Sequence, residues 1–220
     1  MTTQHTQERI VATATQLFNQ FGAKDVSVNL IAQSAGISRG HLHYHYRRKE
    51  EIIQDIFSRV ARQTEANWNG DANRPTLAHM REMFRRCMVI MWEYRFLHRE
   101  LGSLQHHDPV LRDYVELHSQ KRLVHLNQFF EALIDAGVMR RPEHQALDAL
   151  IKVMFMVANN WFSYALLRDE RVCEARVDEG VATMLCVLRP YLKERAPSTL
   201  VLAALAATVP AGVCARAGRL

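Results

Sequence analysis

Cysteine is scarce in this sequence, and the cysteines present lie far apart. The 220 residues contain four, with no C-x-x-C spacing: Cys87, Cys173, Cys186 and Cys214. Such a pattern argues against a disulfide framework and against a zinc ribbon. It fits a protein of a reducing cytoplasm.

Catalytic and targeting motifs are missing too. The sequence has no Ser-His-Asp order, glycine-rich phosphate loop or H-E-x-x-H motif, so we expect neither an enzyme nor a cofactor. The N-terminal MTTQHTQERI lacks an apolar signal core, which makes export unexpected. No stretch reaches the ~20 apolar residues of a membrane span, so we expect no membrane partner.

Charge of one sign is only modestly in excess, at a net +5. Residues 1–50 hold six Lys and Arg against three Asp and Glu, whereas residues 51–195 hold twenty of each. The positive excess lies at the N-terminus, as a polyanionic partner such as nucleic acid would require. An excess of three over fifty residues is also within ordinary scatter and decides little alone.

Residues 27–49 predict two short helices joined by a tight turn. Ser27 and Ser38 are suitable N-caps, because a serine hydroxyl accepts a hydrogen bond from the first helical turn. Gly36 stands between them, where a residue of positive φ is needed. In the second helix Leu42 and Tyr46, four residues apart, should point inward. This pattern predicts a helix-turn-helix.

The outer side of that second helix carries Arg39, Gly40, His43, Tyr44 and Arg47. Arginine can donate two hydrogen bonds to guanine, and glycine permits a close approach to the major groove. The same turn also occurs in ordinary helical proteins, so an αα corner without DNA remains an alternative reading of these residues.

The N-terminal region resembles the DNA-binding domain of the TetR family of bacterial transcriptional regulators. The resemblance rests on three ordered runs: Ala14-x-x-Leu17-Phe18-x-x-x-Gly22, Ile31-Ala32-x-x-Ala35-Gly36-Ile37-Ser38, and Gly40-x-Leu42-x-Tyr44-His45-Tyr46-x-x-Lys49-x-x-Ile52. Two positions depart from it, since His43 stands where Tyr is usual and Tyr46 where Phe is usual.

The resemblance implies contacts to double-stranded DNA. It places Lys49, at the start of a long helix, on the DNA backbone, where such contacts fix position without reading sequence. The candidate DNA-binding residues are Ser27, Asn29, Ser38, Arg39, Gly40, His43, Tyr44, His45 and Lys49. A solvated Asn29 is an equally good reading.

The rest of the chain predicts helices over residues 7–21, 49–68, 76–95, 95–104, 110–136, 143–168 and 174–194. We expect an all-α fold: a helix-turn-helix domain over residues 1–50, connected by helix 49–68 to a helical effector-binding and dimerisation domain over residues 51–195. The apolar tail, residues 196–220, is expected to be disordered or irregular.

Two groups of apolar residues in the larger domain suggest binding surfaces. Large adaptable side chains could line an effector pocket or simply fill the core: Met83, Cys87, Met91, Trp92, Phe96, Tyr114, Phe129, Met154, Asn159 and Trp161. The last two long helices carry surplus apolar surface that a second copy could bury. In the family these helices form a four-helix bundle across a two-fold axis. The expected interface residues are Leu147, Ile151, Phe155, Phe162, Val181, Leu185 and Leu188.

These patterns together predict a cytoplasmic, homodimeric DNA-binding regulator, a repressor of a palindromic operator that an unidentified small apolar effector releases. One alternative is a constitutive DNA-binding factor without a ligand. Another is a metal-responsive regulator that uses some of the eleven histidines, although only His41 and His45 of the H-x-H-x-H run share a helix face. A helical enzyme or carrier is the most distant alternative.

Overall fold

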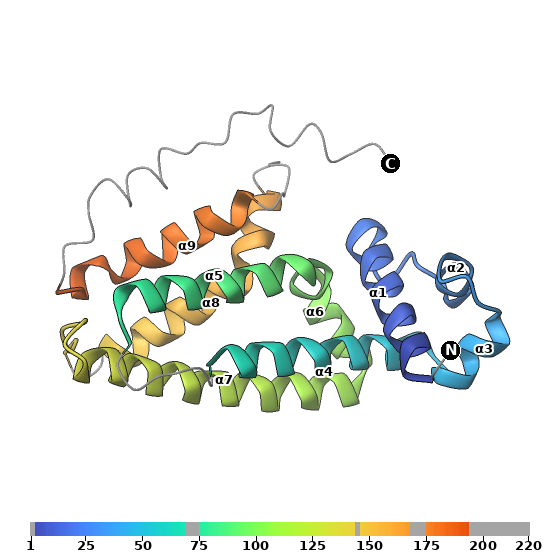
Figure 1. Cartoon of the computed structure of the whole chain (residues 1–220), viewed down its shortest axis with the longest axis horizontal. Coiled ribbons are helices and arrows are strands. Elements are labelled where there is room, and N and C mark those ends of the chain that lie inside the picture. Colours follow the sequence, from blue (N-terminus) through green and yellow to red (C-terminus); the bar gives the residue numbers. More distant parts are fainter. Residues whose placement is uncertain (1–2, 69–74, 144–145, 168–174, 194–220) are drawn as a thin grey trace. The chain divides into compact units, whose positions relative to one another are not determined.

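The computed structural model describes residues 3–68, 75–143, 146–167 and 175–193, and these residues are helical apart from loops and one β-bridge, between Met139 and Leu192. The all-α prediction is confirmed. Residues 69–74, between the expected helices 49–68 and 76–95, and the tail 196–220 lie outside the described residues. The helices (Figure 1) are α1 (Thr3–Phe21), α2 (Val28–Ser34), α3 (Arg39–His45), α4 (Lys49–Trp68), α5 (Leu77–Glu93), α6 (Arg95–His107), α7 (Pro109–Asp135), α8 (Ala146–Leu167), α9 (Ala175–Leu188) and the 3-10 turn η1 (Arg189–Tyr191).

The chain forms two compact units, neither of which is one continuous stretch. Unit 1 comprises residues 1–63 and 94–119, and unit 2 comprises residues 64–93 and 120–220, so α4 and α7 contribute to both. The sequence placed a division after residue 50 and gave no sign that α6 groups with the N-terminal helices. The expected functional domains, 1–50 and 51–195, stay a prediction.

The core of unit 1 is built from α1, α2, α4 and α6. Ile10, Phe18 and Ile56 are fully buried, and the Phe18 ring lies 5.0 Å from the ring of Phe96 in α6. The apolar stripe expected along α1 holds except at Phe21, which is 51% exposed. Phe21 is the last residue of α1 and lies beyond the part of the helix that other elements cover.

Unit 2 is an apolar bundle in which α5, α8 and α9 contact one another. Seven of its buried core residues are methionines: Met80, Met83, Met88, Met91, Met139, Met154 and Met184. Gly180 in α9 allows a close approach, because a Cβ there would stand 2.2 Å from the Met88 side chain and 2.9 Å from Trp161.

Helix α8 corrects one expectation. Its 22 residues have a mean hydropathy of 1.3 over an 18-residue window, long and apolar enough for a membrane span by length and composition alone. Eight of its residues are instead buried among the helices of unit 2: Leu147, Leu150, Ile151, Met154, Ala158, Trp161, Phe162 and Ala165. These residues form the side of α8 that packs in the core of unit 2.

Candidate nucleic-acid interface

The α2–α3 corner has the caps that its sequence predicts. Ser27 Oγ accepts a hydrogen bond from the Leu30 N–H at 3.2 Å, and Ser38 Oγ accepts one from the His41 N–H at 3.1 Å. Gly36, in the turn, has a φ of +63°. Both serine hydroxyls therefore act first as helix caps, and each keeps an O–H that can donate outward. Asn29 is exposed on α2.

Helix α3 presents a clear inner and outer side. Leu42 is fully buried and Tyr46, its C-cap, is 5% exposed, as predicted. Arg39, Gly40, His43 and Tyr44 are exposed, the last to 77%. The exposed side thus brings together a guanidinium, an imidazole and a phenol on one short helix, all able to donate to phosphates or base edges.

Neither backbone conformation nor packing against the described residues requires a glycine at position 40. Its φ is not in the left-handed region, and a Cβ there would have as its nearest neighbour only Ser38 Oγ, at 4.0 Å. Glycine in a helix is destabilising by roughly 0.5–1 kcal/mol relative to alanine. The fold therefore tolerates a residue that weakens α3 and leaves its backbone bare on the exposed side.

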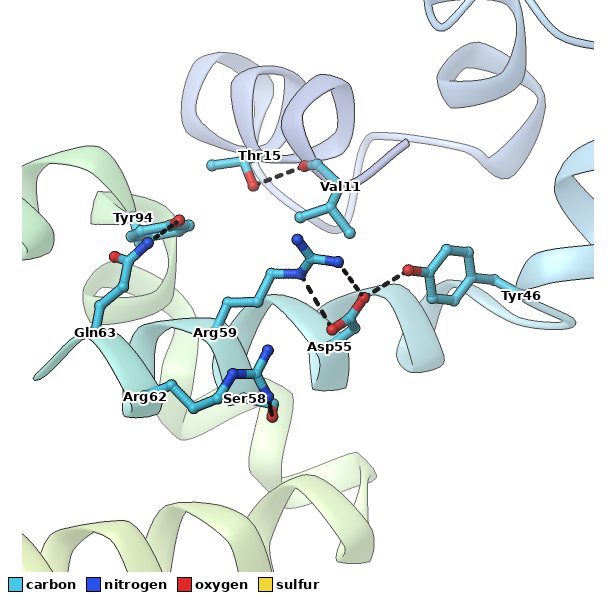
Figure 2. A network of polar contacts seen from close by, with 9 residues as sticks. All are labelled: Val11, Thr15, Tyr46, Asp55, Ser58, Arg59, Arg62, Gln63 and Tyr94. Atoms are coloured by element: carbon cyan, nitrogen blue, oxygen red, sulfur yellow. Dashed lines mark hydrogen bonds and ion pairs between the residues drawn. The ribbon is translucent and has the colours of Figure 1, made fainter. Parts of the chain in front are cut away.

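A polar network fastens the end of α3 to α4 (Figure 2). The Tyr46 hydroxyl donates to Asp55 Oδ2 at 2.6 Å, while Arg59 donates from Nε and Nη2 to the two carboxylate oxygens of Asp55, each at 3.2 Å. Burial, then the hydrogen bond to Asp55, raises the pKa of Tyr46 well above its usual value. The phenol therefore remains a donor, which accounts for a tyrosine where the family usually has phenylalanine.

His45 differs from the other candidates because it is only partly exposed. Its ring lies 5.4 Å from His41 and edge-on to Tyr44, and its Nε2 atom is buried without a partner among the described residues. Burial, and then the neighbouring His41, lowers the pKa of His45. The imidazole is therefore neutral at pH 7 and belongs to the packed end of α3 more than to its open side.

Lys49 is held by contacts within its own chain. Its ammonium donates to the carbonyl oxygens of Ala23 and Val26, at 2.5 and 3.0 Å, and approaches that of Lys24 at 3.4 Å. The adjacent Glu51 carboxylate accepts the Arg47 N–H at 2.8 Å. Lys49 therefore fastens the α1–α2 loop to the start of α4 within the chain, and its expected contact with the DNA backbone stays a prediction.

Helix α6 is hydrogen-bonded to the end of α1, a feature that the sequence did not reveal. The Phe96 N–H donates to Asn19 Oδ1 at 3.0 Å, and Arg99 Nη2 donates to the Phe18 carbonyl at 3.1 Å. Glu100 Oε2 accepts the Ala23 N–H at 2.9 Å. These partners are 77 or more residues apart, so no local pattern could have paired them.

A cleft of about 770 Å³ lies in unit 1 beside these contacts. Its lining joins the α1–α2 loop, the start of α4, and α6: among others Phe21, Lys24, Lys49, Glu50, Arg99, Glu100 and His107. None of the ten residues expected to line an effector pocket is part of it.

The expected effector residues divide between the two units. Phe96 packs on Phe18 in unit 1, and Tyr114, also in unit 1, is 47% exposed. The other eight belong to unit 2: Met83, Cys87, Met91, Trp92, Phe129, Met154, Asn159 and Trp161. All of them except Trp92 and Asn159 are buried. The expected effector pocket stays a prediction.

The expected dimer residues are largely occupied within their own chain. Five of the seven are buried in the core of unit 2: Leu147, Ile151, Phe162, Val181 and Leu188. Phe155 and Leu185 are partly buried and pack against the same core. The apolar periodicity of these residues is accounted for by packing within the core of unit 2, and the expected interface stays a prediction.

Potential metal ligands do not gather in the described part of the chain. No group of three or more His, Cys, Asp and Glu side chains there could hold an ion. His41 and His45 face each other as a pair and no third such ligand joins them.

A capped α2–α3 corner with an exposed, donor-rich second helix defines a helical protein of the helix-turn-helix class. Two family models match the chain: "Bacterial regulatory proteins, tetR family" over residues 10–56 and "Bacterial transcriptional repressor", the TetR model, over residues 59–200. The chain therefore belongs to the TetR family of DNA-binding transcriptional regulators, which are not enzymes.

Individual relatives agree with this assignment. A TetR-family transcriptional regulator from Marinobacter aquaeolei VT8 superposes with a TM-score of 0.82 at 26% identity, covering 94% of this chain and 98% of that chain. The uncharacterized HTH-type transcriptional regulator YhgD of Bacillus subtilis (strain 168) is 28% identical over 159 residues, 68% of this chain and 79% of that protein. A putative transcriptional regulator from Saccharomonospora viridis in complex with choline shares the fold, with a TM-score of 0.68 at 17% identity over 87% of this chain and 100% of that one.

Proposed function

We propose that this regulator is a homodimeric repressor that binds a palindromic operator and is released by a small effector. The observation that carries the proposal is the exposed side of α3, where Arg39, Gly40 and His43 meet solvent beside Tyr44. Positive charge is in excess over residues 1–50, with six Lys and Arg against three Asp and Glu. Both features suit a helix that enters the major groove.

Within the proposed interface the residues have different tasks. Arg39 and His43 read base edges, and Gly40 lets the backbone of α3 approach them. Tyr44, Asn29 and the outward O–H groups of Ser27 and Ser38 contact phosphates and fix the register. His45 acts indirectly, by packing the end of α3.

A second copy is required, because one seven-residue helix reads too few base pairs. Helix α8 supports dimerisation through a stripe that its own unit leaves exposed: Val153, Met156, Asn160, Tyr164 and Leu167. These positions follow at intervals of three or four residues and so share one side of α8. The four apolar members are 36% to 87% exposed, a surface that pairing with a second α8 would bury.

The stripe is tested by charge insertion. Met156→Glu places a carboxylate in the proposed interface and should shift the protein to monomer in sedimentation equilibrium, whereas Leu166→Glu, on another side of the same helix, should not. A wild-type monomer, or a Met156→Glu dimer as stable as the wild type, would refute an interface at this stripe.

Release is proposed to pass through α6. Because α6 is hydrogen-bonded to the end of α1 through Phe96, Arg99 and Glu100, a displacement of α6 would carry the helix-turn-helix with it. An effector that prefers one arrangement then alters the spacing of two recognition helices, which must stay about one DNA turn (~34 Å) apart. The choline complex of the Saccharomonospora viridis relative supports a small-molecule effector. We propose that the protein acts in the cytoplasm, where the DNA that it would bind is located.

Selection of bound sequences from a random duplex pool tests the DNA-binding part. We expect a palindrome with half-sites about one turn apart, and an affinity that falls steeply with salt concentration. Recovery of no preferred sequence would contradict the proposal that α3 reads base edges.

A further inference from the structure

Arg122, in the middle of α7, is a buried cation with few hydrogen-bond partners among the described residues. Its residue is 5% exposed. Its one hydrogen bond is a long one, from Nη1 to Asn159 Oδ1 at 3.4 Å, and its Nε is buried without a partner among the described residues. The guanidinium carbon lies 5.4 Å from the centre of the Phe155 ring.

No described carboxylate neutralises this charge. The ion pairs of unit 2 join other residues, such as Lys121 with Glu65 on the surface. The thiol of Cys87 interacts electrostatically with Arg122, but burial raises the pKa of that thiol, so it is neutral. Burial lowers the pKa of Arg122, yet arginine stays protonated in proteins. A desolvated, unpaired cation is among the most destabilising groups that a core can hold.

A second unsatisfied polar group flanks the same cysteine. Asn67, at the end of α4, donates from Nδ2 to the Met83 carbonyl and to Cys87 Sγ, both at 3.1 Å. Its Oδ1 atom is buried and accepts no hydrogen bond from the described residues. Four helices of unit 2, namely α4, α5, α7 and α8, therefore contribute to this cluster, in which Arg122 offers a spare donor and Asn67 a spare acceptor.

The core of unit 2 is rich in side chains that can change rotamer. Seven of its buried residues are methionines, whose unbranched, polarisable side chains adapt to irregular shapes. Such side chains can change rotamer to pack against an incoming apolar group.

We propose that Arg122 is the anion-binding residue of the effector site, and that the effector is an apolar carboxylate whose hydrocarbon body packs among the methionines of unit 2. This rests on the proposed effector-controlled function and names its ligand class. The carboxylate pairs with the guanidinium, whose Nε and Nη1 donate to it. Asn67 Oδ1 accepts a hydrogen bond where the ligand carries a hydroxyl or amide N–H nearby.

The test compares ligands of one shape and three charges on the full-length protein. Isothermal titration with decanoate, decanol and decyltrimethylammonium should give binding of decanoate that is roughly 10- to 100-fold tighter than that of decanol. The cation should bind least. Arg122→Met, which keeps the volume and removes the charge, should abolish the preference for decanoate over decanol.

Arg86→Met is the matched control, because Arg86 is exposed and pairs with Glu82 one turn away; its ligand preference should equal that of the wild type. Arg122→Met should also unfold at a higher temperature than the wild type, since the buried charge is gone. Equal affinity of the wild type for decanoate and decanol, no binding of decanoate, or a preference that survives Arg122→Met, would each overturn the assignment.

The operator separates failure of this site from failure of the proposed function. If an operator is bound and neutral or cationic compounds release it while decanoate does not, the repressor proposal stands and the role of Arg122 falls. If decanoate binds through Arg122 without weakening operator binding, the site stands and release by this ligand falls.

Discussion

Replacing Gly40 by alanine should strengthen the fold and weaken DNA binding at once. A methyl at this position would have only Ser38 Oγ as its nearest neighbour, at 4.0 Å, and the backbone is not left-handed. Alanine removes the entropic cost of a helical glycine, roughly 0.5–1 kcal/mol. In a chain of this length that raises the unfolding temperature by about 1–4 °C.

The expected loss of DNA affinity follows from where the methyl would project. Gly40 is the second residue of α3, next to Arg39 on the exposed side. A methyl there would hold the helix off the groove and lengthen the hydrogen bonds made by its neighbours. A specific base contact is worth about 1–3 kcal/mol, so affinity for the selected operator should fall between about fivefold and 100-fold.

Gly102→Ala is the control for the effect of helix propensity alone. Gly102 lies inside α6, is exposed, and a Cβ there would meet nothing within 4 Å. It should stabilise the protein by a similar amount and leave operator affinity unchanged. The assays are thermal unfolding by circular dichroism and fluorescence anisotropy with a labelled operator. Operator binding by Gly40→Ala that equals that of the wild type would refute the close-approach argument, and a lower unfolding temperature would refute the packing argument.

Three further outcomes are expected. Tyr46→Phe removes one hydrogen bond to Asp55 while Arg59 still pairs with that carboxylate, so urea titration should show a loss of about 1 kcal/mol; no change would mean that the network does not hold α3. Lys49→Met should lower stability by about 1–3 kcal/mol, since carbonyls of the α1–α2 loop lose their donor; a smaller salt slope of DNA binding in this variant would support the expected phosphate contact, and an unaltered slope would contradict it. Because the pKa of His45 is lowered in the folded protein, the unfolded state binds protons first, so stability is lost as the pH falls below the unfolded value of about 6.5; His45→Gln should flatten that part of a pH series of unfolding temperatures.

The reading of α2 and α3 could be made from the sequence because its causes are local. Ser27, Gly36 and Ser38 act on their own backbone or on residues three positions away. Leu42 and Tyr46 are four residues apart among polar neighbours, and this spacing indicates one buried side of the helix. Short-range hydrogen bonds and helical periodicity need no knowledge of the rest of the fold.

Lys49 shows where that reasoning stops. Lys49 lies at the start of a helix, after two arginines and before two glutamates. In this context its ammonium could bind either a DNA phosphate or a cluster of backbone carbonyls. Only the path of the chain brings the carbonyls of Ala23 and Val26 within 3.0 Å of its ammonium. The apolar periodicity of α8 is ambiguous in the same way, because it marks buried residues without saying whether the same chain or a second copy buries them.

Local sequence patterns were sufficient to assign this protein to the helix-turn-helix regulators, because its caps, its turn glycine and its exposed donors depend on contacts within a few residues. The tertiary structure decided the partners of the long side chains. In the fold, Tyr46 donates a hydrogen bond to the Asp55 carboxylate, and α6 is hydrogen-bonded to the end of α1. Arg122 is buried without a carboxylate partner among the described residues. Such pairings depend on which distant segments the packing of apolar faces brings together, and periodicity along one helix carries no information about its neighbour.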